Sequence, residues 1–126
     1  MRNATRQQGA ANRYRAGYTF ERKVTEHLQS DGYWTVEARG SHGLADIVAV
    51  KPGQVLLIQA KGGHAGLTHL EWNALHTLAT RLGAIALVAD RPRRGAVRLR
   101  QITGQHAQRS RLWPCAPFST DTVAST

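Results

Sequence analysis

The sequence predicts an α/β domain in which a mixed β-sheet is flanked by helices, in the order α-β-β-β-α-β-β. Two apolar runs, 45–50 and 55–60, are separated by Pro52-Gly53, which is typical of a β-hairpin. Patterns of helical period precede and follow this hairpin, and another apolar run comes after the second of them. Apolar residues on both faces of the hairpin strands favour a sheet that is covered on both sides.

The first helix is expected over residues 17–31. Its apolar side chains recur at four-residue spacing, which places them on one face: Phe20, Val24 and Leu28. Gly32 follows as a stop signal. Residues 33–39 alternate enough for a strand, which the Gly-Ser-His-Gly segment at 40–43 ends.

A second helix is expected over residues 68–82. Thr68 and Glu71 form a Thr-x-x-Glu capping box, and Leu67 with Trp72 can make the hydrophobic staple. Gly83 then ends the helix. The expected apolar face of this helix comprises Leu67, Leu70, Ala74, Leu75, Leu78 and Leu82.

The rest of the chain predicts an apolar strand at 84–89, a basic turn at 90–95 and a more exposed strand at 96–102. From about residue 104 onward the pattern is loop-like. A length of 126 residues suits one domain with one core. The expected organisation is a flexible basic arm (1–15), a folded domain (16–104) and a C-terminal extension (105–126).

Charge is the unusual feature of the composition. The chain has 17 Lys and Arg against 8 Asp and Glu, a net charge of +9 and a pI near 11.1. Lys23, Lys51 and Lys61 are its lysines, so arginine dominates, and the planar guanidinium suits phosphate. This balance favours a nucleic-acid partner over a merely basic, soluble surface.

Several other classes are excluded. One cysteine, Cys115, allows neither an intrachain disulfide framework nor a Cys-based zinc cluster. His42, His64 and His69 fit no common zinc template. The N-terminus has no secretory apolar run, and no stretch approaches the ~18 apolar residues of a membrane span. The expectation is a cytoplasmic protein without membrane association or a small-molecule cofactor.

Four polar side chains interrupt the apolar patterns. Glu21 borders the inward face of the first helix, where a buried carboxylate is costly unless it is paired. Asp46 lies within the apolar run 45–50. Gln59 and Lys61 leave their strand on the same face, because side chains alternate along a strand.

The register of the hairpin brings three of these side chains together. In an antiparallel hairpin, the numbers of residues that face each other have a constant sum. If Lys51 and Gln54 flank a two-residue loop, that sum is 105, and Asp46 lies opposite Gln59. A four-residue loop gives the same register, whereas an odd loop leaves the two residues diagonal. Lys61 then lies one step further along, and the carboxylate of the first helix can approach the same strand end.

Oxygen ligands of this kind suit Mg²⁺ or Mn²⁺ and leave coordination positions for phosphate oxygens. Such a metal activates bound water and neutralises charge at phosphorus. A neighbouring lysine can orient or help to deprotonate that water, or stabilise the pentavalent phosphorus. The alternative is a buried ion-pair network of Asp46 and Glu21 with Lys61. Clustering at one strand end of a strongly basic chain favours the catalytic interpretation.

Four short segments carry a family resemblance: Phe20-Glu21-Arg22, Glu37-Ala38-Arg39-Gly40-Ser41, Ala45-Asp46-Ile47-Val48 and Gln59-Ala60-Lys61. In their order and spacing, they resemble the archaeal-type Holliday junction resolvases (Hjc) of the PD-(D/E)XK nuclease superfamily. The resemblance covers about residues 14–103 and implies a restriction-endonuclease-like sheet. It also implies a homodimer that binds a four-way DNA junction and nicks two strands symmetrically with Mg²⁺.

The resemblance also implies roles for single residues. Glu21, Asp46, Gln59 and the carbonyl of Ala60 would hold the metal, and Lys61 would be the catalytic lysine. Ser41 would belong to the loop that enters the DNA. The candidate DNA contacts combine positions that match the family with other basic side chains: Arg13, Arg15, Arg22, Arg39, His42, His64, Arg91, Arg93 and Arg94.

Two positions depart from the family pattern. Gln59 stands where these resolvases usually have glutamate, and a neutral amide oxygen predicts a lower metal affinity. Ala45 stands where the motif name expects proline, which these resolvases often lack. Two alternative functions remain open. One is another nuclease of the same superfamily, of the restriction or repair type, and the other is a non-catalytic module that binds branched DNA. Resolvases of this kind also occur in bacteriophages, and the location would then be the host-cell cytoplasm.

Overall fold

A computed structural model describes residues 19–38, 44–61, 66–91 and 96–120 of the chain. These residues form one six-stranded sheet whose strands follow one another in sequence order. Residues 19–30 form a helix, here called the first helix. The other elements are β1 (Trp34–Glu37), β2 (Ile47–Lys51), β3 (Gln54–Lys61), α2 (His69–Leu82), β4 (Ile85–Asp90), β5 (Arg98–Ile102) and β6 (Cys115–Pro117).

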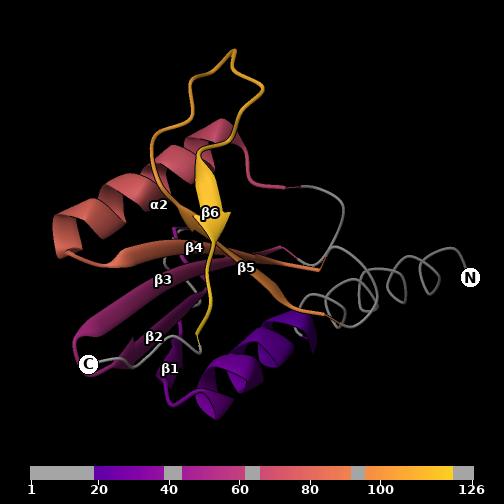
Figure 1. Ribbon diagram of the computed structural model, residues 1–126, viewed down its shortest axis with the longest axis vertical. Coiled ribbons are helices and arrows are strands. Elements are labelled where there is room, and N and C mark those ends of the chain that lie inside the picture. The colour runs from indigo at the N-terminus through magenta and orange to yellow at the C-terminus, as the bar shows by residue number, and fades with distance from the viewer. Residues whose placement is uncertain (1–18, 39–43, 62–65, 92–95, 121–126) are drawn as a thin grey trace, which may run out of the picture.

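The sheet is mixed and lies between helices. Strands β3 and β4 are parallel and are joined through α2, whereas the other neighbouring strands are antiparallel. Figure 1 shows α2 over one face of the sheet and the first helix over the other. The predicted fold class is therefore confirmed. The short strand β6, which pairs with β5, is an addition that the loop-like pattern after residue 104 did not predict.

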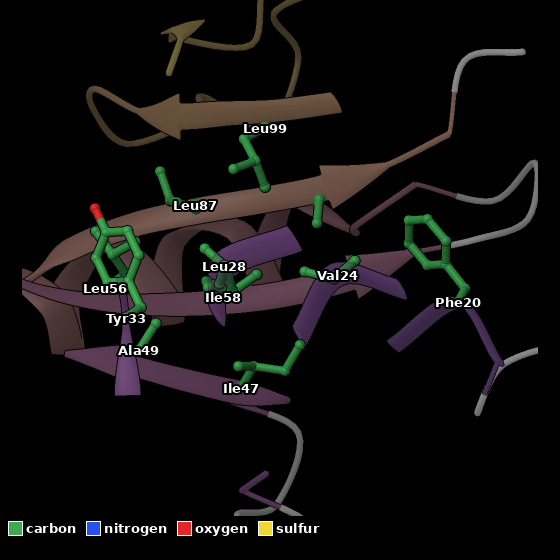
Figure 2. Packing of buried hydrophobic residues seen from close by; sticks show 11 residues of the cluster. Phe20, Val24, Leu28, Tyr33, Ile47, Ala49, Leu56, Ile58, Leu87 and Leu99 are labelled. Atoms are coloured by element: carbon green, nitrogen blue, oxygen red, sulfur yellow. The ribbon is translucent and has the colours of Figure 1, made fainter. Parts of the chain in front are cut away.

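Each face of the sheet carries a hydrophobic core. The first-helix core contains Phe20, Val24 and Leu28, each no more than 1% exposed, which pack on alternate residues of β2, β3 and β4 (Figure 2). The α2 core lies on the other face. It comprises Ala45, Leu57, Leu67, Trp72, Leu75, Ala79, Ala86, Val88 and Ile102. Because both faces are buried, the hairpin strands are apolar on both sides, as the sequence indicates.

The β2–β3 hairpin has a two-residue loop, one of the loop lengths that the sequence left open. Lys51 pairs with Gln54, and the same register continues to the pair Ile47 and Ile58. Gly53 has φ +77°, a left-handed conformation that glycine adopts without steric cost. Turn and register are therefore confirmed for all five pairs of the ladder.

Helix α2 begins and ends as predicted, but its buried face differs. Both hydrogen bonds of the capping box between Thr68 and Glu71 are present, and Gly83 ends the helix at φ 67°. Leu70 and Leu82, however, are 70% and 61% exposed, so the expected apolar face is wrong at these two positions. The buried side chains are Trp72, Leu75 and Ala79. The helix carries two apolar stripes, and the sheet covers the one that contains Trp72.

Candidate active site

Asp46 lies where β2 leaves the regular ladder. The pair Ile47 and Ile58 is the last of the β2–β3 register, and the N–H of Asp46 also donates to the carbonyl of Ile58, at 2.8 Å. Two consecutive residues thus oppose Ile58, which is the arrangement of a β-bulge. The packing of the neighbouring residues agrees with a bulge. Residues two apart on a regular strand share a face, but Ala45 packs in the α2 core and Ile47 in the first-helix core.

The bulge gives the Asp46 carboxylate a backbone partner. Its Oδ2 accepts a hydrogen bond from the N–H of Ala60 at 2.8 Å, which fixes the carboxylate beside the end of β3. The sequence placed Asp46 opposite Gln59. The predicted register holds as far as the pair Ile47 and Ile58. At Asp46 the bulge shifts it, and the carboxylate binds the N–H of Ala60.

Gln59 and Lys61 leave β3 on the face that α2 covers, in accordance with strand alternation. Gln59 is 3% exposed and pairs in register with Val88 of the α2 core. Lys61 is the last residue of β3, and its Nζ lies 3.6 Å from Oε2 of Glu71. The alternative considered from the sequence was an ion-pair network of Lys61 with Asp46 and Glu21. The ion pair that Lys61 forms in the structure is with Glu71 of α2.

Glu71 connects the lysine to the start of α2. Its Oε1 accepts a hydrogen bond from the N–H of Thr68, while its Oε2 faces Lys61. The Thr68 backbone bond is the main reason that the pKa of Glu71 lies below its ordinary value, and the Lys61 charge adds to it. The sequence identified Glu71 only as a helix cap.

Glu21 lies at the same end of the sheet as Lys61, on the first helix. The guanidinium of Arg91, which directly follows β4, lies 5.3 Å from the centroid of the Phe20 ring. Figure 2 shows Phe20 at the far end of the first-helix core from Tyr33. The start of the helix is therefore near the carboxyl end of β4. Glu21, which follows Phe20 and is half-buried, therefore lies at this end of the sheet on the helix that covers the face opposite α2.

A second charged cluster adjoins Lys61. Asp90 ends β4 and pairs in register with Lys61. Its carboxylate accepts hydrogen bonds from Nε and Nη2 of Arg98, at 2.8 Å each, and from Nη2 of Arg100, at 2.9 Å. Burial alone would raise the pKa of Asp90, but the two arginines outweigh it and hold that pKa below its ordinary value. The sequence placed Asp90 only in the basic turn at 90–95, although its position at the end of an apolar strand parallels that of Lys61.

Asn in place of Asp90 is expected to destabilise the domain by about 1–2 kcal/mol at neutral pH, because two arginines lose a shared carboxylate. The carboxylate's pKa is lowered on folding, so its contribution is present above the ordinary value of 3.8 and lost as the pH falls through the folded value. Denaturant unfolding at pH 7 and near pH 3 measures this. A difference between wild type and variant that stays constant with pH would contradict the assignment.

The remaining predicted DNA contacts divide into two groups. Arg22 is exposed and pairs with Glu26 at 3.3 Å on the surface of the first helix, and Arg91 lies against Phe20. The other candidates lie outside the described residues: Arg13, Arg15, Arg39, Ser41, His42, His64, Arg93 and Arg94.

The donor types at this strand end fit a hard divalent cation. They are the carboxylate of Asp46, the carboxamide of Gln59, the carbonyl of Ala60 and the carboxylate of Glu21. Within the described part of the chain, no group of three or more His, Cys, Asp or Glu side chains is placed to hold an ion. A cation here would therefore depend on amide, carbonyl and phosphate oxygens as well as carboxylates.

A pocket of about 270 Å³ lies at the other end of the sheet. It is lined by Tyr33, Gln54 and residues 117–120, and Gln54 begins β3 whereas Lys61 ends it. This pocket takes no part in the candidate site. Among the described residues, no helix has the length and apolar character that crossing a bilayer requires.

The fold and the site define a class. A mixed sheet between helices, with a carboxylate, a carboxamide and a lysine at the ends of two adjacent strands, suits a nuclease, because these groups can act on a phosphodiester. The chain belongs to the archaeal Holliday junction resolvase (Hjc) family, whose model matches residues 12–111.

Comparison with solved structures supports this assignment. The chain is similar to Hjc from Archaeoglobus fulgidus, described as a Holliday junction resolvase from an archaeal hyperthermophile, with 31% sequence identity and a TM-score of 0.58. The match covers 66% of this chain and 70% of that one. None of the curated proteins compared with the chain matches it.

Proposed function

We propose that this chain is a divalent-metal-dependent endonuclease, which resolves four-way DNA junctions by paired symmetric nicks through phosphodiester hydrolysis. The observation that carries the proposal is the strand end where the bulged Asp46 meets the end of β3, with Gln59 and Lys61 on the adjacent positions. We propose the cytoplasm as its location, because its substrate is DNA and the free thiol of Cys115 suits a reducing compartment.

The protein groups have separable tasks in this reaction. The Ala60 N–H holds one oxygen of Asp46, so that the carboxylate is oriented before DNA arrives. Gln59 presents a neutral amide at a site that is 3% exposed, where an unpaired carboxylate would be costly. Bound Mg²⁺ or Mn²⁺ would supply an activated water and neutralise charge on the scissile phosphate.

Lys61 is suited to stabilise charge. Its ammonium lies 3.6 Å from the Glu71 carboxylate, which limits where the flexible side chain points. An ammonium in this position can donate hydrogen bonds to a phosphoryl oxygen as negative charge develops on it. Glu71 is itself fixed by its bond to Thr68, so the lysine is positioned by the start of α2.

Cleavage of a labelled four-way junction, beside duplex, splayed and single-stranded controls in Mg²⁺ and Mn²⁺, tests the function. We expect paired nicks in the junction and little cleavage of the controls. Preferential cleavage of linear duplex would favour a restriction- or repair-type nuclease. Binding of the junction without cleavage in either metal would identify a non-catalytic module.

A homodimer is the assembly we propose, and α2 carries a surface for it. Leu70 and Leu82 are exposed, with the partly buried Leu78 and Ala74 between them along the helix. An apolar stripe of this kind suits burial against a second copy related by a two-fold axis. Light scattering should give a dimer for the wild type and a monomer for Leu70→Glu. A monomeric wild type would contradict this proposal.

Glu in place of Gln59 is expected to lower the half-activating Mg²⁺ concentration by on the order of tenfold, because a charged ligand replaces a neutral one. A buried carboxylate is costly without a cation, so the variant should also unfold at a lower temperature in EDTA and recover in Mg²⁺. Metal titrations of cleavage and of thermal unfolding measure the two effects. An unchanged metal dependence in both would remove Gln59 from the metal site.

A further inference from the structure

A loop that the candidate active site does not use stands out from the body of the molecule. Residues 103–114 connect β5 to β6, and Figure 1 shows this β5–β6 loop projecting over α2. The N–H of Thr103 donates to the carbonyl of Pro114 at 2.9 Å, so the two ends of the loop are joined. A surface loop with joined ends that is packed by its own side chains can hold one shape.

The base of the β5–β6 loop is anchored to the first half of α2. Nε1 of Trp72 donates to the carbonyl of Gly104 at 3.0 Å. The side chain of Asn73 binds both backbone groups of His106, donating to the carbonyl at 3.0 Å and accepting from the N–H at 2.6 Å. The His106 ring stacks on Trp113, with ring centroids 3.6 Å apart. These contacts fix the loop to the helix.

The tip of the loop presents positive charge and an apolar side chain to solvent. Arg109 and Arg111 are exposed, and Leu112 is 80% exposed. Residues 103–120 contain no Asp or Glu, so nothing within this segment neutralises the arginines. One exposed leucine is ordinary by itself. Here its N–H is held by the Ser110 hydroxyl at 3.0 Å, on a loop that is anchored at its base.

The loop is close to the candidate active site through α2. Glu71 reaches Lys61 at 3.6 Å, and the next residue, Trp72, holds Gly104 at the base of the loop. The base of the loop and the partner of Lys61 therefore lie on consecutive residues at the start of α2.

We propose that the β5–β6 loop is a second DNA-contacting element, which binds an arm of the four-way junction beside the cleavage site. Arg109 and Arg111 contact backbone phosphates, and Leu112 packs on the base pair at the branch point. Phosphate contacts position a protein on DNA, and apolar side chains stabilise base steps whose stacking is interrupted. The inference rests on the proposed function. DNA fits better than a second copy of the tip, because a two-fold contact would bring arginines together.

Junction binding in EDTA, where cleavage does not interfere, tests the loop. For the double variant Arg109→Gln, Arg111→Gln, we expect the Kd to rise by on the order of tenfold and the salt slope to fall by about two, one for each phosphate contact. Thermal unfolding should not change, since both side chains are exposed. Leu112→Ser should lower the preference of the protein for junction over duplex, because the duplex has no branch point. The salt slope should not change, because leucine carries no charge.

Arg81, exposed in the last turn of α2, provides the matched control, and Arg81→Gln should bind as the wild type does. If the wild type binds the junction and the double variant keeps its affinity and slope, the loop proposal is wrong and the proposed function stands. A wild type that does not bind the junction overturns both. A change in oligomeric state of the double variant in light scattering would assign the loop to a contact between copies and overturn the DNA contact.

Discussion

Asparagine in place of Asp46 is expected to reduce junction cleavage by at least about a thousandfold. The variant keeps a side-chain oxygen that can accept the hydrogen bond from the Ala60 N–H, so the bulge and the strand pairing should survive. What it loses is the negative charge that would bind a divalent cation. Single-turnover cleavage of a labelled junction with excess enzyme in Mg²⁺ measures the effect.

Two comparisons separate chemistry from folding in this experiment. Junction affinity in EDTA should not be weakened in Asp46→Asn, whereas Asp46→Ala should also lose about 1–3 kcal/mol of stability because the Ala60 N–H is left without a partner. Glu26→Gln removes a carboxylate from the exposed pair with Arg22 and serves as the matched control, with cleavage unchanged. Cleavage by Asp46→Asn at a rate close to the wild type would show that the metal site lies elsewhere.

The hairpin could be predicted because its determinants are local. A Pro-Gly turn between two apolar runs places the loop, and loops of two or four residues give the same register, which decides which side chains share a face. The bulge at Asp46 could not be predicted in the same way. The single residue that breaks the alternation is recognisable only from the opposite strand, where Ile58 accepts the hydrogen bond of an additional residue.

Contacts between distant elements account for most of what the sequence did not show. Helix α2 has apolar residues on two stripes, and which one is buried depends on its position over β3 and β4. The three-residue strand β6 has too short a pattern to be read from polarity alone, and its pairing with β5 stabilises it.

The charged partners of the site illustrate the same limit. Lys61 and Asp90 each end an apolar strand, and parallel pairing of β3 with β4 places them side by side. The position of Asp90 was visible in the sequence, but its partners Arg98 and Arg100 follow only from the antiparallel register of β4 and β5. The sequence correctly predicted that Glu71 caps α2. It did not predict the second contact of Glu71, because that contact joins α2 to Lys61 on β3.

Alanine in place of Lys61 is expected to reduce cleavage by on the order of 10²–10⁴-fold, because the ammonium that stabilises charge on the scissile phosphate is lost. Arginine at this position should restore little of the rate. Its planar guanidinium is longer and wider than an ammonium and directs its N–H groups differently, so it would not place a donor where Nζ of Lys61 faces Glu71. Junction affinity in EDTA should change by far less than the rate in both variants, and that separation is measured on the same labelled substrate.

The variant Glu71→Gln tests whether the lysine must be positioned. Glutamine can still complete a capping box with Thr68, so α2 should keep its start, whereas the ion pair with Lys61 is removed. We expect cleavage to fall by about tenfold with thermal unfolding little changed, an intermediate result because the ammonium remains but is less constrained. Thr68→Ala is the complementary control, since it weakens the cap and leaves the carboxylate facing Lys61. If Glu71→Gln cleaves as the wild type does while Lys61→Ala is inactive, the lysine acts without help from α2, and the ion pair serves the fold alone.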